Sequence, residues 1–169
     1  MHASNNGPAA PGGLALGRMT LTVRARGAIV CERRAGNMVL RSGAGVIAAL
    51  ASGHAGAGPI DTIGIGFARE PGGAEMAALT PPDAALAIPA AALRTALSAD
   101  SFRIISDRPG AVRLEIAAVF KPSQEIAGVT EAALLAGEVL YNQVIFEPVT
   151  LAVGQDVTFF WQIDFPFGH

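Results

Sequence analysis

The sequence is poor in charge, in cysteine and in large aromatic side chains. Asp, Glu, Lys and Arg make up 15% of its 169 residues, whereas Cys, Trp and Tyr occur once each. An average soluble domain has about 25% charged residues. The lone Cys31 excludes an intrachain disulfide and any metal site built from several cysteines. The formal net charge of −2 lacks the basic excess of a nucleic-acid-binding protein, so no nucleic-acid partner is expected.

Long hydrophobic runs are missing as well. A membrane-spanning helix needs about 20 consecutive apolar residues. The stretch 46–60 is broken by glycine, serine, histidine and proline, and the stretch 139–151 contains Asn142, Gln143 and Glu147. Residues 1–18 have neither the basic start nor the apolar centre of a secretory signal. We therefore expect no membrane partner.

Small apolar residues are what the sequence has in abundance. Apolar types account for 51% of the chain, and 33 of its residues are Ala and 20 are Gly. The mean hydropathy of +0.42 is high for a protein that works alone in water. Because a membrane span is not expected, we infer that the chain buries much of its surface against neighbouring subunits.

Composition divides the chain into two parts. Residues 1–18 are rich in Gly, Pro, Ala and Asn without periodicity, which indicates a flexible or partner-bound N-terminal arm. Residues 19–169 carry the periodic patterns of one domain. Within it, the long loop 69–89 contains Gly72-Gly73 and Pro81-Pro82. A loop of this length is usually functional or ordered by a partner.

The domain is predicted to be mainly β with one short helix. Apolar and polar residues alternate in 20–26, with Gly27 as a bulge or bend and Gly36-Asn37 as a turn. Ser42 is the expected N-cap of a helix that stops at Gly53. Further strands are expected at 60–68, 101–107, 111–120, 129–135, 138–151 and 156–165, and one or two helical turns at 90–97. Such regular strands and turns predict an antiparallel β-sandwich of the jelly-roll type.

The sequence shows no metal-binding or nucleophilic motif. His2, His54 and His169 are scattered and have no second ligand at a neighbouring helical or strand position. Cys31 lies beside two arginines but has no evident histidine partner, so we interpret it as a packing residue. The segment IGIG at 63–66 lacks the complete glycine spacing of a nucleotide-binding loop. No cofactor, metal or catalytic residue is therefore assigned.

Paired carboxylates are the remaining catalytic possibility. Glu131, Glu138 and Glu147 lie near one another in the sequence, and a glycosidase needs two carboxylates about 5–10 Å apart across a cleft. Such clefts usually carry aromatic walls, and Tyr141 and Trp161 are the only Tyr and Trp in the chain. We therefore expect a protein that is not an enzyme.

The order of several short motifs resembles a family of small structural proteins of tailed bacteriophages, found among tail-fibre and baseplate components. The motifs are the Gly-Asn-x-Val step at 36–39, an Ala-rich helix, IGIG at 63–66, PPDAAL at 81–86, TEAALL at 130–135, LYNQVIF at 140–146 and FWQIDF at 160–165. The resemblance covers about residues 20–165. It departs from the family pattern at Ala133, where a glycine is common.

The resemblance implies a non-enzymatic virion protein, made in the host cytoplasm, that assembles as a trimer or hexamer and contacts neighbouring virion proteins in the tail, baseplate or fibre attachment. It carries no catalytic residues. Glu131 is then expected to be a buried or half-buried acceptor near Asn142 and Gln143, and Trp161 a core residue. Two alternatives stay open: a capsid decoration or head–tail neck protein, and a carbohydrate-binding module that recognises a bacterial surface.

Overall fold

The computed structural model describes residues 16–56 and 58–167. Most of the predicted N-terminal arm, residues 1–15, lies outside the described part, as do His2 and His169. The first strand begins at Leu16, so the last three residues of the predicted arm belong to the sheet. The strands, in chain order, are β1 (Leu16–Ala25), β2 (Ala28–Val39), β3 (Thr62–Gly66), β4 (Arg94–Ala96), β5 (Phe102–Ile105), β6 (Ala111–Phe120), β7 (Ile126–Ala136), β8 (Val139–Leu140), β9 (Asn142–Leu151) and β10 (Gln155–Pro166).

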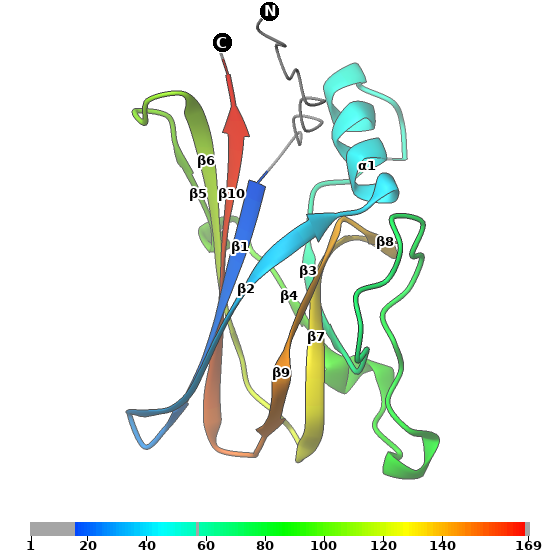
Figure 1. The fold of residues 1–169 in the computed structure, drawn as a ribbon, viewed down its shortest axis with the longest axis vertical. Coiled ribbons are helices and arrows are strands. Elements are labelled where there is room, and N and C mark those ends of the chain that lie inside the picture. Colours follow the sequence, from blue (N-terminus) through cyan, green and yellow to red (C-terminus); the bar gives the residue numbers. More distant parts are fainter. Residues whose placement is uncertain (1–15, 57, 168–169) are drawn as a thin grey trace, which may run out of the picture.

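All ten strands belong to one antiparallel sheet that curls into a half-barrel. The order along the sheet is β4-β3-β7-β9-β2-β1-β10-β6-β5, and β8 pairs with β7. Figure 1 shows the long strands β1, β6 and β10 on one side of the molecule and β3, β7 and β9 on the other. The two ends of the sheet, β4 and β5, are consecutive in the chain and only residues 97–101 separate them. That short connection brings the ends of the curled sheet close together.

The prediction of a sandwich made from two sheets is therefore wrong. The strand β2 pairs with β1 along its length and with β9 only at Met38 and Val39, so it carries the hydrogen-bonded ladder from one layer to the other. From Met38 back toward Arg33, β2 separates from β9 and the two strands are no longer paired. There the guanidinium of Arg33 bridges the two strands. It donates to the backbone carbonyls of Glu147 (3.2 Å) and Pro148 (3.2 Å) on β9.

The core lies inside the curled sheet. Side chains that alternate along β1 and β10 point inward because successive residues of a strand face opposite sides. They meet side chains from β3, β7 and β9 on the opposite layer. The fully buried members include Met19, Leu21, Val23, Ile63, Ile116, Ile126, Val129, Leu134, Leu151, Val157, Phe159, Trp161 and Ile163. Trp161 stacks on Phe159 with ring centroids 5.8 Å apart, which confirms its expected place in the core.

The one α-helix of the described residues, α1 (Arg41–Ser52), ends as predicted and begins differently. Gly53 adopts a left-handed conformation (φ 66°) after the last turn, where a residue without a Cβ is least strained. The N-cap position belongs to Leu40, whereas the Ser42 hydroxyl donates to the carbonyl of Leu140 at 2.7 Å. The helix is thus fixed to β8 through a serine side chain.

Two turn predictions near the N-terminus have different outcomes. Gly27 (φ 83°) and Arg26 (φ 52°) form the two-residue turn between β1 and β2. The bulge lies a few residues earlier, between Val23 and Arg24. The predicted turn at Gly36-Asn37 is wrong, because these residues continue β2. Gly36 and Asn37 pair with Arg18 and Gly17 of β1, and that pairing overrides the local turn preference.

Of the remaining segments, 90–97 forms a 3-10 turn, η2 (Ala90–Leu93), followed by β4. The long loop 69–89 contains a second 3-10 turn, η1 (Ala84–Leu86), and a third, η3 (Ala99–Ser101), precedes β5. Residues 67–93, which include η1 and η2, form a separate layer over the outer face of β3 and β7. We call this layer the covering segment.

Candidate functional site

A buried carboxylate fixes the covering segment to the sheet. Glu131 lies on the outer face of β7 and is 0% exposed. Its carboxylate accepts hydrogen bonds from the backbone N–H groups of Thr80 (2.9 Å) and Ala68 (3.3 Å). It also accepts one from Nε2 of Gln143 on β9 (2.6 Å). Three donors thus compensate for removing the carboxylate from water.

The neighbouring Gln143 extends this anchor. Its Oε1 accepts a hydrogen bond from the backbone N–H of Gly72 at 2.8 Å. Glu131 and Gln143 therefore hold the covering segment at three backbone positions: Ala68, Gly72 and Thr80. The sequence-based prediction for Glu131, a buried acceptor near Gln143, is confirmed. Asn142 has a separate role, because its Oδ1 accepts from the N–H of Leu134 at 2.8 Å.

The glycines of the IGIG segment allow this close approach. A Cβ at Gly66 would overlap Oε2 of Glu131 and lie 3.1 Å from the carbonyl oxygen of Thr80. At Gly64 a Cβ would lie 2.5 Å from Leu79 of the covering segment. The repeated glycines thus place the covering segment directly against β3, a role unrelated to nucleotide binding.

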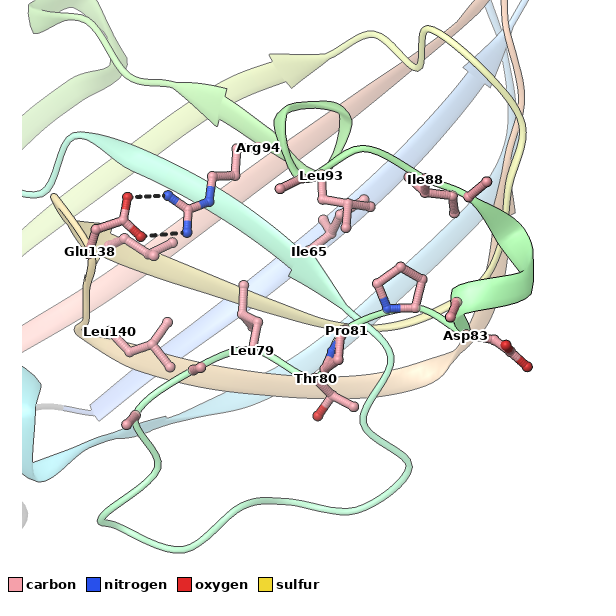
Figure 2. Close-up of a pocket in the computed structure, with 17 residues that line it drawn as sticks. Ile65, Leu79, Thr80, Pro81, Asp83, Ile88, Leu93, Arg94, Glu138 and Leu140 are labelled. Atoms are coloured by element: carbon pink, nitrogen blue, oxygen red, sulfur yellow. Dashed lines mark hydrogen bonds and ion pairs between the residues drawn. The ribbon is translucent and has the colours of Figure 1, made fainter.

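The covering segment leaves two open grooves. The first groove has a volume of about 500 Å³ and a mainly apolar lining that includes Ile65, Leu79, Ile88, Leu93, Leu135 and Leu140. Figure 2 shows an ion pair between Arg94 and Glu138 at one end of this groove and Asp83 at the other. Its volume falls within the range of about 300–1,000 Å³ that is typical of ligand-binding sites.

The ion pair at the end of the first groove is bidentate. Nη1 and Nη2 of Arg94 donate to the two carboxylate oxygens of Glu138 at 2.7 and 2.8 Å. This hydrogen bonding lowers the pKa of Glu138 and raises the pKa of Arg94. Both groups therefore stay charged around neutral pH.

The second groove lies on the other side of Pro81 and Asp83, which line both grooves. It has a volume of about 700 Å³. Its lining combines apolar and charged residues of the covering segment with residues of β7 and β9: Phe67, Arg69, Pro81, Asp83, Leu86, Gly128, Thr130, Ile145, Phe146, Glu147 and Pro148. This groove is open to solvent and, like the first, has three charged lining residues.

The three candidate carboxylates of the sequence do not form a catalytic pair. Glu131 is buried and fully hydrogen-bonded, Glu138 is bound to Arg94, and Glu147 is exposed at the second groove. Tyr141 and Trp161 are buried, and burial raises the pKa of the Tyr141 phenol. Neither ring is on the surface, so neither forms an aromatic cleft wall.

The other candidate residues lie apart from the grooves. Cys31 is a partly buried free thiol that packs against the core. His54 follows α1, and its Nδ1 lies 2.7 Å from the hydroxyl of Ser52, a local contact at the helix end. Among residues 16–56 and 58–167, no three His, Cys, Asp or Glu side chains gather closely enough to hold a metal ion.

Sequence reasoning located the covering segment but not its grooves. The length of the 69–89 loop was the signal that it has a role. The lining residues Asp83 and Arg94 were missed because their importance depends on how the segment folds back along β3. Both grooves combine apolar lining residues with charged ones, an arrangement that suits a ligand surface with apolar and charged groups.

Comparison of the chain with models of protein families, with curated proteins and with solved structures finds no significant match. No helix in the described part of the chain is long and apolar enough to cross a membrane.

Proposed function

We propose that this protein is a non-enzymatic structural subunit of a tailed-bacteriophage virion, which assembles with copies of itself in the tail, baseplate or fibre attachment. The phage assignment is supported by the order of motifs along residues 20–165, which resembles small tail proteins. The mainly β fold with one short helix is compatible with that resemblance.

The observation that carries the assembly role is the set of large apolar side chains that are exposed. Among the described residues, the exposed large apolar side chains are Ile29, Val30, Ile47, Leu50, Leu86, Ile104, Val119, Val139, Val153 and Phe167. They occur on the β1–β2 hairpin, on α1, on the covering segment, on β5, β6 and β8, and in the segments that follow β9 and β10. Where these side chains gather, as on the β1–β2 hairpin and on α1, a neighbouring subunit is expected to cover them.

The alternative role in a capsid or head–tail neck uses the same kind of surface at another place in the virion. The carbohydrate-binding alternative depends on exposed aromatic side chains on which sugar rings stack. Tyr141 is 1% exposed and Trp161 is 0% exposed, so neither supports that role.

The direct test is the native mass of the purified full chain, measured by light scattering over a wide concentration range. We expect a discrete trimer or hexamer, since covering the exposed apolar side chains stabilises the assembled state. A chain that stays monomeric at every concentration contradicts self-assembly. Glycan-array binding by the purified chain would favour the carbohydrate-binding alternative.

A further inference from the structure

The β1–β2 hairpin projects from the body of the protein and has an unusual tip. We define the hairpin tip as residues 24–30. Within it, Ile29 is 51% exposed and Val30 is 56% exposed. Two successive residues with positive φ close the turn, as a tight hairpin with the normal strand twist requires. The tip is thus a well-defined protrusion that presents apolar side chains to solvent.

The same hairpin is basic in a protein whose net charge is negative. Residues 24–34 contain four arginines and a single acid, Glu32, which pairs with Arg34 at 2.9 Å. Arg24 and Arg26 are exposed at the tip and form no ion pair within the described residues. A partner for this tip therefore needs apolar surface together with unpaired acidic side chains.

The second groove has these properties. Asp83 and Glu147 are exposed at its edge, and neither forms an ion pair in the part of the chain that the structure describes. Leu86, another lining residue, is 46% exposed. One cation, Arg69, lines the groove, and the guanidinium of Arg33 lies beside it at the carbonyls of Glu147 and Pro148. The attraction for the tip therefore comes from the two exposed carboxylates and not from a net negative charge.

The hairpin tip lies apart from the second groove, although Arg33, farther along β2, reaches the carbonyls of the lining residues Glu147 and Pro148. In Figure 1 the hairpin tip extends at the lower left, and the turn of the covering segment that borders the grooves lies at the lower right. A tip therefore has to reach the groove of another copy. A contact between two different surfaces of identical chains is heterologous, and such contacts close into rings when the rotation allows.

From this complementarity we propose that the hairpin tip of one copy binds in the second groove of the next copy, so that the chains assemble head to tail into a ring. Arg24 and Arg26 face Asp83 and Glu147 of the neighbour, and Ile29, which pairs with Arg24 and shares its face of the hairpin, covers apolar lining. This inference rests on the proposed function, which supplies self-assembly, and adds the surfaces that join the copies.

A charge exchange in the full chain tests the contact. We expect Arg26→Glu or Glu147→Arg alone to weaken assembly about tenfold or more, because each places like charges across the contact. The double variant Arg26→Glu/Glu147→Arg restores opposite charges at every contact of the ring. We expect its assembly to return to near the wild-type level. Assembly is measured by light scattering over a concentration series, and circular dichroism reports whether each variant is folded.

Matched controls lie on the β5–β6 hairpin, away from both surfaces. Arg103→Glu and Asp107→Arg change charge at exposed positions and are expected to leave assembly unchanged. If the wild-type chain is an oligomer that Arg26→Glu and Glu147→Arg do not affect, this contact is wrong while self-assembly stands. Weakening by both single variants without recovery in the double variant also contradicts the contact. A monomeric wild-type chain contradicts self-assembly itself.

Discussion

The two layers of the curled sheet bury their residues in different ways. Along β10, buried residues such as Phe159 and Trp161 alternate with partly exposed ones such as Phe160 and Gln162. Along β7, every residue from Val129 to Ala136 is buried. The difference arises because solvent covers the outer face of β10, whereas the covering segment lies over the outer face of β7.

This difference shows that each layer depends on a different kind of interaction. The β1–β10–β6 layer is held by apolar side chains on one face. The β3–β7–β9 layer has a second interface, in which the polar side chains of Glu131 and Gln143 fix the position of a long irregular segment. Substitutions in the core are therefore expected to lower the stability of the whole fold. Substitutions of Glu131 or Gln143 are expected first to release the covering segment and so to change the grooves.

The largest effect is expected from Trp161→Ala in the core of the first layer. Trp161 is 0% exposed, and truncation of a buried aromatic residue costs about 3–5 kcal/mol. The neighbouring Gln162 faces outward, where its Nε2 donates to Glu115 at 3.0 Å. Gln162→Ala is expected to cost about 1 kcal/mol or less. Urea denaturation of both variants measures the contrast, and equal losses contradict it.

A smaller and more local effect is expected from Glu131→Ala in the second layer. The substitution leaves the N–H groups of Ala68 and Thr80 and the amide of Gln143 without their acceptor, at a cost of about 3 kcal/mol. Hydrogen exchange at residues 67–83 is expected to accelerate more than exchange in β1 and β10. The exposed Glu125→Ala is the control, with a change within about 0.5 kcal/mol.

The glycines of the covered layer provide an independent check on this anchor. Gly66→Ala places a methyl group against Glu131 and is expected to mimic its loss. Gly73→Ala has no heavy atom within 4 Å of the new Cβ and is expected to leave exchange unchanged. If the two glycine variants behave alike, the covering segment is not held against β3 as described.

The smallest effect concerns an ion pair on the solvent-covered face of the first layer. Asp164 accepts hydrogen bonds from Nε and Nη2 of Arg113 at 2.7 and 2.8 Å. These bonds, with the charges of Arg113, Arg108 and Arg18, lower the pKa of Asp164 from its ordinary value of 3.8. Because the lowered pKa belongs to the folded state, the stabilisation is present above about pH 4 and is lost as the pH falls through the folded-state pKa.

We therefore expect Asp164→Asn to reduce stability at pH 7 by less than about 1 kcal/mol, since solvent screens the pair. The difference from the wild type should shrink as the pH is lowered from 4 to 2. Urea denaturation at several pH values measures this, with Asp107→Asn as a control at an exposed carboxyl. A difference that stays constant over this range contradicts the assignment.

Sequence reasoning succeeded where local chemistry decides the structure. Alternating residues located β1, β6 and β10, Gly53 ended the helix, and Glu131 was identified as a buried acceptor. It failed where pairing between distant residues decides. Gly36-Asn37 has the local preference of a turn, but pairing with β1 extends the strand through it.

The alternation of apolar and polar residues could not predict the overall architecture either. Alternation of apolar and polar residues shows that one face of a strand is buried. The same alternation occurs whether the strands form two sheets or one curled sheet. The continuity of the sheet depends on two residue pairs between β2 and β9, Met38–Gln143 and Val39–Asn142. The grooves in turn depend on the path of an irregular segment, which has no periodicity to interpret.

The place of β10 in the sheet has a consequence for synthesis of the chain. β10 lies between β1 and β6, and Leu16 pairs with Asp164. At about 5–20 residues per second, the ribosome makes β1 on the order of 10 s before its partner exists. During that interval β1 has an unpaired edge that is able to pair with other nascent chains, and β6 has one from its own synthesis until β10 follows. Folding of this layer is therefore completed only after translation has passed residue 166, and slower translation lengthens the period in which the chain is prone to aggregate.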